Sequence, residues 1–306
     1  MMAAVSPGRP SLRRRVTLIL TVLVVVVGGS VGGSGSPAHA QSSPTSYVAL
    51  GDSFTAGPLI PDQIANPIGC LRSDSNYPHN LAPFGQQAFR DVSCSGARTT
   101  HMFNPQSVTG GPNPPQLNAV DTNTQLVTLG VGGNDIGFSE IIQECATINP
   151  FGTPCQDRFN PGGNDEISRR IAETAPRVGD VLAAISARAP DADVFVIGYI
   201  AILPSSGFGC WPSMPIAWRD VPYLRAKQLE LNAMLANQAA AHGATYVDVY
   251  TPSIGHNACT SSGTRWVEPI IPANAAAPVH PNARGMAGVA GVIHATVAQT
   301  VEAAAG

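Results

Sequence analysis

Short runs of apolar residues that do not alternate with polar ones constrain the fold of this chain more than any other feature. They lie at 47–50, 126–131, 194–199 and 245–250, and a weaker run leads into 91–94. Segments with helical periodicity separate or follow them, at 137–147, 164–188, 218–242 and 282–303. Apolar strands without alternation suit a parallel sheet covered on both faces. Strands that alternate with helices therefore predict a doubly wound α/β sandwich.

The first forty residues have a different character from the rest. Four arginines, at positions 9 and 13–15, precede an apolar-plus-Thr run at 16–27, and Ala38-His39-Ala40 ends the segment. A basic start, a short apolar core and an A-x-A ending are the parts of a secretory signal peptide. The run of twelve residues is shorter than the ~20 that cross a bilayer. We therefore expect a signal peptide over 1–40 and a secreted, extracellular mature chain without an integral membrane segment; a retained anchor is the alternative.

The remainder, 41–306, is expected to form one domain. It shows no internal repeat and no linker, and its long loops lie near 57–80, 101–122, 148–164 and 203–217. Without the leader it has 13 Lys and Arg against 20 Asp and Glu, a net charge of −7. A nucleic-acid partner requires a basic footprint, so none is expected. A monomer is the default expectation.

Six cysteines remain in the mature part, an even number that favours three disulfides in an exported protein. They are Cys70, Cys94, Cys145, Cys155, Cys210 and Cys259. The sequence alone permits fifteen pairings. No pair has the C-x-x-C spacing, which argues against a zinc or redox site. No histidine spacing suggests a metal site either, and no cofactor is expected.

Polar segments follow the strands at the positions where open α/β sheets bind ligands, which are the carboxyl ends of the strands. Gly51-Asp52-Ser53 follows the first strand. A serine at the turn into a helix is exposed and could act as a nucleophile, with backbone N–H groups nearby for an oxyanion. The alternative is that Ser53 only caps the helix.

Two further segments could supply oxyanion donors. Gly96 follows the second strand, where the lack of a side chain lets a backbone N–H approach a ligand. Asn134, in Gly132-Gly133-Asn134-Asp135, carries an amide that can donate to an oxyanion. Simple turn roles are the alternative for both residues, and a turn role is the interpretation we favour for Asp135. His280, between a Pro-rich loop and the final helix, is the candidate base.

Together, the G-D-S, S-G, G-G-N-D and H-P-N blocks resemble those of the SGNH (GDSL-type) hydrolases, in particular the secreted actinobacterial lipases and esterases. The resemblance extends from Tyr47 to the last helix. It implies a three-layer α/β/α sandwich around a five-stranded parallel sheet, with a flavodoxin-like arrangement. By position, Ser53 would be the nucleophile and His280 the general base, while Gly96 N–H and Asn134 Nδ2 would join the Ser53 N–H as oxyanion donors.

The same resemblance implies three sequential disulfides, namely Cys70–Cys94, Cys145–Cys155 and Cys210–Cys259. One departure from the family pattern concerns the residue three positions before the histidine, which is commonly Asp but here is Ala277. A backbone carbonyl can accept the same Nδ1–H bond and hold the tautomer. We therefore expect a Ser53–His280 dyad oriented by the Ala277 carbonyl. A carboxylate at Nδ1, such as Asp248 or Glu268, would contradict this.

The resulting hypothesis is a secreted serine carboxylic-ester hydrolase acting on a small-molecule or lipid ester through an acyl-enzyme. A short-chain or carbohydrate O-acetyl esterase is the alternative within the class, and a non-catalytic secreted binding protein is the alternative outside it. Several aromatic residues could line an acyl groove, and the alternative, expected for most of them, is packing in the core or in loops. They are Phe54, Phe138, Phe208, Trp211 and Trp266.

Overall fold

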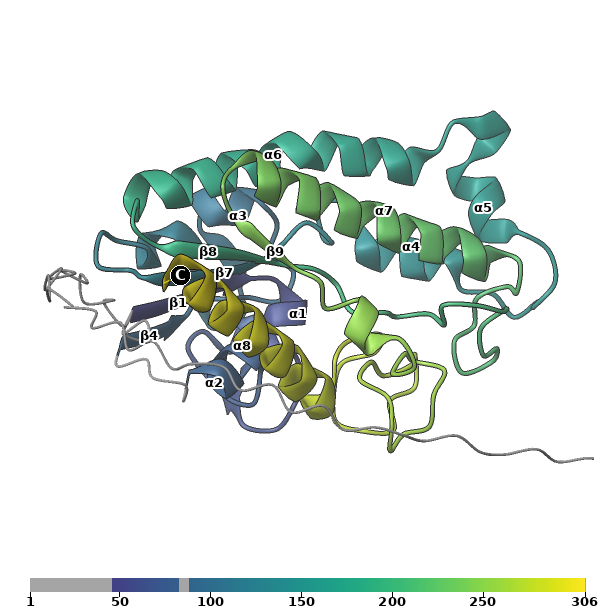
Figure 1. Ribbon diagram of the computed structural model, residues 1–306. Coiled ribbons are helices and arrows are strands. Elements are labelled where there is room, and N and C mark those ends of the chain that lie inside the picture. The colour runs from purple at the N-terminus through teal and green to yellow at the C-terminus, as the bar shows by residue number, and fades with distance from the viewer. Residues whose placement is uncertain (1–45, 83–87, 306) are drawn as a thin grey trace, which may run out of the picture. The chain divides into compact units, whose positions relative to one another are not determined.

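A five-stranded parallel sheet forms the centre of the protein in a computed structural model that describes residues 46–82 and 88–305 (Figure 1). Across the sheet the strands are β4 (Ala88–Asp91), β1 (Ser46–Gly51), β7 (Leu126–Gly130), β8 (Asp193–Ile197) and β9 (Thr245–Val247). Every pairing is parallel, and the register sets Val48 opposite Val127 and Val127 opposite Val194. All five predicted strands are confirmed. The expected signal peptide lies outside the described residues.

The two central strands show why their sequences lack alternation. Every residue of β1 and of β7 is buried. Both faces of these strands are covered, so apolar side chains are favoured on both faces.

Helices cover the two faces of the sheet and complete the expected three-layer α/β/α sandwich (Figure 1). On one face, α6 (Glu166–Arg188) packs against α7 (Asp220–Ala241). On the other, α8 (Ala283–Ala305) packs against the short α2 (Tyr77–Leu81). The three long helices and α4 (Phe138–Cys145) agree with the segments predicted from periodicity. Among the described residues, no helix is long and apolar enough to span a membrane.

The strand order determines where a ligand can bind. In chain order the five strands are arranged second, first, third, fourth, fifth, so the connection that follows β1 runs to β4 on one side, and the connection that follows β7 runs to β8 on the other. Such a switch point leaves a crevice at the carboxyl ends of the strands. The segments after β1, β4 and β7, which carry Ser53, Gly96 and Asn134, all reach this edge.

The long loops contain short elements that the periodicity analysis did not predict. Two small hairpins pair β2 (Gln63–Ile64) with β3 (Arg72–Ser73) and β5 (Gln106–Val108) with β6 (Gly111–Asn113). The short helices are α1 (Ser53–Ala56), α3 (Thr100–Phe103) and α5 (Pro154–Phe159), and the 3₁₀ turns are Ile68–Cys70, Gln116–Ala119, Pro161–Gly163 and Thr251–Ser253. Two-stranded hairpins depend on packing against the rest of a protein, which explains why pattern alone misses them.

Three disulfides join these loops to each other or to short helices. They join Cys70 to Cys94, Cys145 to Cys155 and Cys210 to Cys259. These are the pairs that the family resemblance implies.

Candidate active site

Ser53 stands at the first position of α1, directly after the end of β1. Asp52 caps this short helix by accepting a hydrogen bond from the Phe54 N–H (2.9 Å). The strand end is held by Gln116, which accepts from the Gly51 N–H (2.8 Å) and donates to the Gly51 carbonyl (2.9 Å). A Cβ on Gly51 would lie 2.1 Å from Thr55 Oγ1, so only glycine fits this turn. These contacts place the Ser53 hydroxyl at the edge of the sheet.

His280 meets Ser53 across 227 residues of sequence. Its Nε2 lies 2.8 Å from Ser53 Oγ, which is hydrogen-bond distance. The Phe54 and Phe138 rings lie 5.2 and 6.2 Å from the imidazole and cover it. Burial lowers the pKa of His280 below its ordinary value, while the carbonyl at Nδ1 opposes this effect. A lowered pKa favours the neutral imidazole, which a general base requires.

The carbonyl that orients His280 belongs to Pro278, and the expectation of Ala277 is wrong by one residue. His280 Nδ1 lies 2.7 Å from the Pro278 oxygen. The Ala277 oxygen instead accepts from the His280 backbone N–H (3.2 Å), in a turn where Val279 has a φ of 58°. This turn leaves the Pro278 carbonyl facing the ring. Because a carbonyl only accepts, Nδ1 must carry the proton, and Nε2 is free to accept one from Ser53.

Neither carboxylate considered from the sequence reaches Nδ1. Asp248 accepts from the N–H groups of Tyr250 and Thr251, at 2.9 and 3.0 Å. Glu268 is fully buried and binds the side-chain amides of Asn274 and Asn282, at 2.7 and 2.6 Å. The expectation of a serine–histidine pair with a main-chain orienting group therefore agrees with the geometry.

The candidate oxyanion donors lie at the ends of the neighbouring strands. Asn134 Nδ2 donates one hydrogen to the Ala97 carbonyl (2.9 Å), next to Gly96, and its second hydrogen stays available. Gly96 has a φ of 78°, in the left-handed region that favours glycine. Within the described part of the chain, neither the Gly96 N–H nor the Ser53 N–H has an acceptor. Asp135 lies in the turn after β7, where its N–H donates to the Gly132 carbonyl (3.1 Å), and its carboxylate accepts from the N–H and hydroxyl of Thr99.

Tyr199, which the sequence analysis did not single out, joins two of these turns. Its hydroxyl accepts from the Gly133 N–H (2.7 Å) and donates to Asp52 Oδ2 (2.6 Å). Burial raises the pKa of Asp52 to about 7, and the bonds from Tyr199 and Phe54 oppose this effect. The only signal in the sequence was the position of Tyr199 at the end of a strand.

An apolar pocket opens beside the pair. Its lining includes Gly133, Tyr199 and Phe138, and the Phe138 ring lies 6.2 Å from the His280 ring. Most of the remaining lining is apolar, and it includes Ile142, Ile167, Leu203, Met214, Ile216 and Leu224, together with the polar residues Lys227 and Gln228.

Of the aromatic residues considered for an acyl groove, Phe138 alone lines this pocket. Phe54 packs on His280, and Phe208 is 62% exposed. Trp266 stacks on His256, and Trp211 donates to the Thr147 carbonyl. Most of these residues are thus packing or surface residues.

A three-layer sandwich with a serine–histidine pair at its switch point is the arrangement expected of a serine hydrolase. The model of the GDSL-like lipase/acylhydrolase family matches residues 49–287. The chain belongs to this family and is a carboxylic-ester hydrolase.

Its relatives include Lipase 2 of Streptomyces coelicolor, 41% identical over 90% of this chain and 94% of the relative. Among solved structures, the extracellular lipase of Streptomyces rimosus is 29% identical with a TM-score of 0.69, over 82% of this chain and 99% of the other. Phospholipase A1 of Streptomyces albidoflavus is 26% identical with a TM-score of 0.70, over 83% and 99%.

Proposed function

We propose that this protein is an exported serine lipase that cleaves lipid acyl esters through an acyl-enzyme on Ser53. The 2.8 Å contact between Ser53 Oγ and His280 Nε2 carries the proposal, because it pairs a nucleophile with a base whose tautomer is determined by the Pro278 carbonyl.

In the first half of the cycle, Ser53 Oγ attacks the ester carbonyl carbon while its proton moves to His280 Nε2. The carbonyl oxygen becomes an oxyanion and accepts from the N–H groups of Ser53 and Gly96 and from Asn134 Nδ2. The intermediate then collapses, and the imidazolium returns the proton to the departing alcohol oxygen.

In the second half, water takes the place of the alcohol. His280 accepts a proton from the water as its oxygen attacks the acyl carbon, and the same donors stabilise the second oxyanion. Collapse breaks the bond to Ser53 Oγ, which regains the proton, and releases the carboxylic acid.

The apolar pocket supports a lipid substrate. Its lining includes Gly133 and Tyr199 and is mostly apolar, so it can take an acyl chain out of water. The relatives named lipase and phospholipase A1 support the same class of substrate. The disulfides, the leader-like residues 1–40 and the extracellular relative support export.

The test is hydrolysis of 4-nitrophenyl esters from acetyl to palmitoyl by the purified enzyme and its Ser53→Ala variant. We expect Ser53→Ala to lower kcat by at least about 10⁴-fold, because removing a nucleophile removes the covalent route. Ser186→Ala changes an exposed serine on α6 and should match the wild type.

The chain-length profile separates the alternatives. A preference for long acyl chains over acetyl is expected of a lipase, because a longer chain buries more apolar surface in the apolar pocket. A preference for acetyl esters would favour the short-chain or carbohydrate O-acetyl esterase. A folded wild type that hydrolyses none of the series would contradict the proposal.

A further inference from the structure

The loop that carries Gly96 leaves the sheet beside its edge strand, so the sheet holds it from one side only. The N–H groups of Val92 and Cys94 donate to the carbonyls of Ala49 and Gly51, each at 3.0 Å. Because β4 is an edge strand of the described sheet, no further strand of that sheet lies on the other side of this loop. Residues from the long loops must hold that side.

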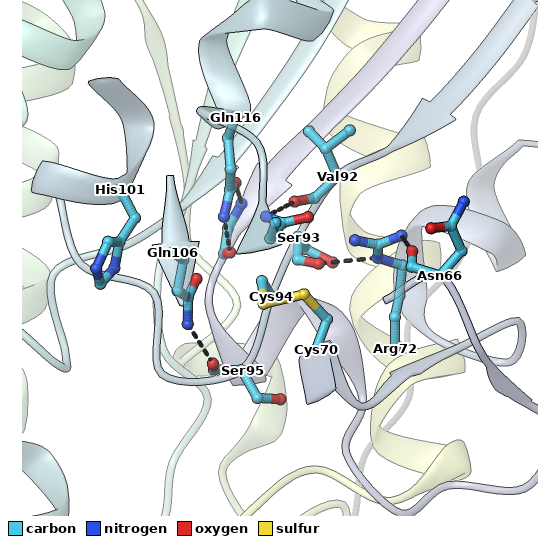
Figure 2. Close-up of a disulfide and its surroundings, with 12 residues drawn as sticks. Asn66, Cys70, Arg72, Val92, Ser93, Cys94, Ser95, His101, Gln106 and Gln116 are labelled. Atoms are coloured by element: carbon cyan, nitrogen blue, oxygen red, sulfur yellow. Dashed lines mark hydrogen bonds between the residues drawn. A yellow bond between two sulfur atoms is a disulfide. The ribbon is translucent and has the colours of Figure 1, made fainter. Parts of the chain in front are cut away.

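Gln106 holds the peptide bond that contains the Gly96 N–H. Its Nε2 donates to the Ser95 carbonyl at 2.8 Å, and the residue is 6% exposed (Figure 2). The Ser95 carbonyl and the Gly96 N–H belong to one peptide unit, which is planar and trans, so the two groups point in opposite directions. A bond that fixes the carbonyl therefore fixes the direction of the N–H.

We propose that Gln106 is a positioning residue for ester hydrolysis, which aims the Gly96 N–H at the oxyanion by holding the Ser95 carbonyl. This inference rests on the proposed role of Gly96 as an oxyanion donor. Gln106 contacts neither Ser53 nor His280 through a hydrogen bond, and it acts through the loop. An oxyanion donor is effective only when it is already in place before charge develops.

The amide of Gln106 has no second hydrogen bond that would explain its burial. Among the described residues, its Oε1 is buried and has no partner. Since the Ser95 carbonyl can only accept, the end of the amide that faces it must be the NH₂ group. The bond to Ser95 is therefore the polar contact that this side chain makes. The backbone of Gln106 is held in turn by the pairing of β5 with β6, opposite Asn113.

The preceding residues of the loop are held from the segment 70–72. Cys70 forms the disulfide with Cys94, and its carbonyl accepts from the Ser95 N–H (2.9 Å). The buried Arg72 donates from Nε to the Ser93 carbonyl (2.8 Å), as Figure 2 shows.

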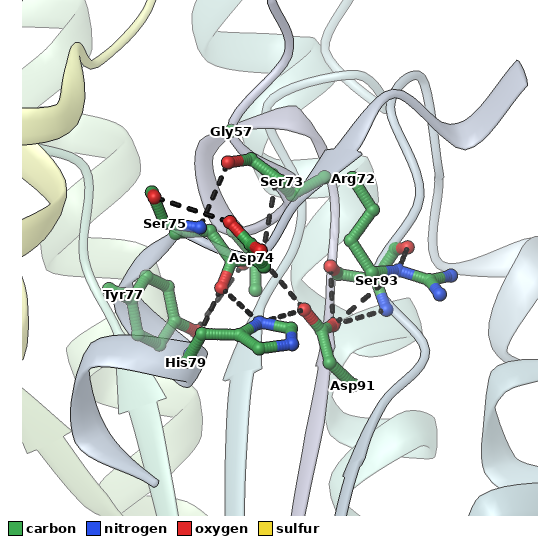
Figure 3. A network of polar contacts seen from close by, with 12 residues as sticks. Gly57, Arg72, Ser73, Asp74, Ser75, Tyr77, His79, Asp91 and Ser93 are labelled. Carbon is green, nitrogen blue, oxygen red and sulfur yellow. Dashed lines mark hydrogen bonds and ion pairs between the residues drawn. The ribbon is translucent and has the colours of Figure 1, made fainter. Parts of the chain in front are cut away.

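Asp91 holds Ser93 from the other side. One oxygen of its carboxylate accepts from both the N–H and the hydroxyl of Ser93, at 3.0 and 2.6 Å (Figure 3). The same oxygen lies 3.8 Å from Arg72 Nε. The loop is thus fixed up to Cys94, and Gln106 orients the peptide that follows.

The test compares the full-length enzyme with Gln106→Met, which keeps a side chain of similar length and removes the donor. We expect kcat to fall about 10- to 100-fold, somewhat less than the loss of a whole oxyanion donor. KM for a 4-nitrophenyl ester should stay within about threefold, because the ground-state carbonyl gains little from the donor. A trifluoromethyl ketone, whose adduct with serine carries an oxyanion, should bind more weakly by the same factor as kcat/KM falls.

Two comparisons calibrate this result. Asn134→Ala removes another proposed oxyanion donor completely, and it shows how far kcat and inhibitor affinity fall when one donor is lost. Ser107→Ala changes the exposed neighbour of Gln106 in the same hairpin and should leave all three quantities unchanged. Far-ultraviolet circular dichroism and thermal unfolding confirm that each variant is folded at the assay temperature.

A folded Gln106→Met variant with kcat and inhibitor affinity within twofold of the wild type would overturn the proposal, as would a change in KM alone. If this variant does not fold, Gln106→Asn decides, because it keeps the amide but is one methylene too short to reach the Ser95 carbonyl: a fall in kcat with matching loss of inhibitor affinity supports the proposal, and unchanged values contradict it. Wild-type activity and its loss in Ser53→Ala are measured in the same series, so failure of the proposed function is distinguished from failure of this inference.

Discussion

At the scale of single residues, Asp52 is an ionisable group of the site that the proposed cycle does not use. Asp52 is buried beside the nucleophile, and the Tyr199 hydroxyl donates to it at 2.6 Å. Burial raises the pKa of Asp52 to about 7, and this hydrogen bond opposes the increase because it favours the ionised form. The same hydroxyl accepts from Gly133, so Tyr199 links the turn after β1 to the turn after β7.

This contact predicts a stability difference that depends on pH. The folded state retains the Asp52 proton that the unfolded chain releases near pH 4, so wild-type stability is lost as the pH rises toward about 7. In Tyr199→Phe the hydrogen bond that lowers the pKa of Asp52 is removed, so this pKa rises further. The loss of folding stability with rising pH then continues to a higher pH. We expect this variant to be destabilised by about 1 kcal/mol more at pH 8.5 than at pH 5, the difference between a charged and a neutral hydrogen bond.

Urea unfolding of both proteins at the two pH values measures the effect. Tyr246→Phe, which removes the hydroxyl of a half-buried tyrosine on β9, is the control and should show no such pH dependence. Equal destabilisation of Tyr199→Phe at both pH values would show that Asp52 is not coupled to Tyr199.

At the scale of elements, the loop that carries His280 is held by the buried carboxylate of Glu268. Glu268 Oε2 accepts from the N–H groups of Ala273 and Asn274, at 2.9 and 3.1 Å. Its Oε1 accepts from the side-chain amides of Asn274 and Asn282, and Asn282 Oδ1 accepts from the Gly285 N–H in the first turn of α8. The Glu268 N–H also donates to the His280 carbonyl (3.0 Å). The Glu268 carboxylate therefore connects the Pro-rich loop to the start of the last helix, and the Glu268 backbone N–H holds the same segment to His280.

Glu268→Gln should destabilise the protein at pH 7 by about 1–3 kcal/mol, because an amide would turn its NH₂ toward groups that are all donors. Burial alone would raise the pKa of Glu268, yet these hydrogen bonds hold it below its ordinary value. A carboxyl whose pKa is lower in the folded protein than in the unfolded chain stabilises the fold at any pH above the unfolded pKa of 4.5. This stabilisation is lost as the pH falls through the pKa of the folded protein. The difference between variant and wild type should thus be smaller at pH 3.5 than at pH 7.

The measurement is again urea unfolding at the two pH values. Glu173→Gln serves as the control, because Glu173 forms an exposed pair with Arg169 that contributes little. A loss for Glu268→Gln that is the same or larger at pH 3.5 would contradict the role assigned to the ionised carboxylate.

At the scale of the whole molecule, loops that are long for an α/β sandwich build much of the site, and disulfides restrain them. The closed segments differ in length, with sequence separations of 10, 24 and 49 residues. In the chain-entropy model, a disulfide stabilises by restricting the unfolded chain, and the effect grows slowly with loop length.

Replacing Cys210 and Cys259 together by serine should therefore cost about 4 kcal/mol, and replacing Cys145 and Cys155 should cost about 3 kcal/mol. The free energies of unfolding in urea measure the two losses, with the wild type reduced by dithiothreitol as a reference. A larger loss for the short loop than for the long one would contradict the entropic explanation for this protein.

Local patterns in the sequence determined the order of strands and helices and the four motif blocks of the site. A buried strand needs unalternating apolar residues, and a turn at its end needs glycine or small polar residues, so segments such as 47–53 and 126–134 are readable without knowledge of their neighbours. The family resemblance added the disulfide pairs, which spacing alone left open.

The tertiary structure alone decided which groups meet. The Pro278 carbonyl, rather than that of Ala277, faces His280 because of the turn at Val279. Tyr199 binds Asp52, which lies 147 residues away in the sequence. Gln106 binds Ser95 from the β5–β6 hairpin, which the sequence pattern did not predict. Such contacts depend on the packing of separate segments, which no local pattern encodes. The physical reason is that a side chain's propensity is local, whereas its hydrogen-bond partner is determined by how the layers and loops assemble.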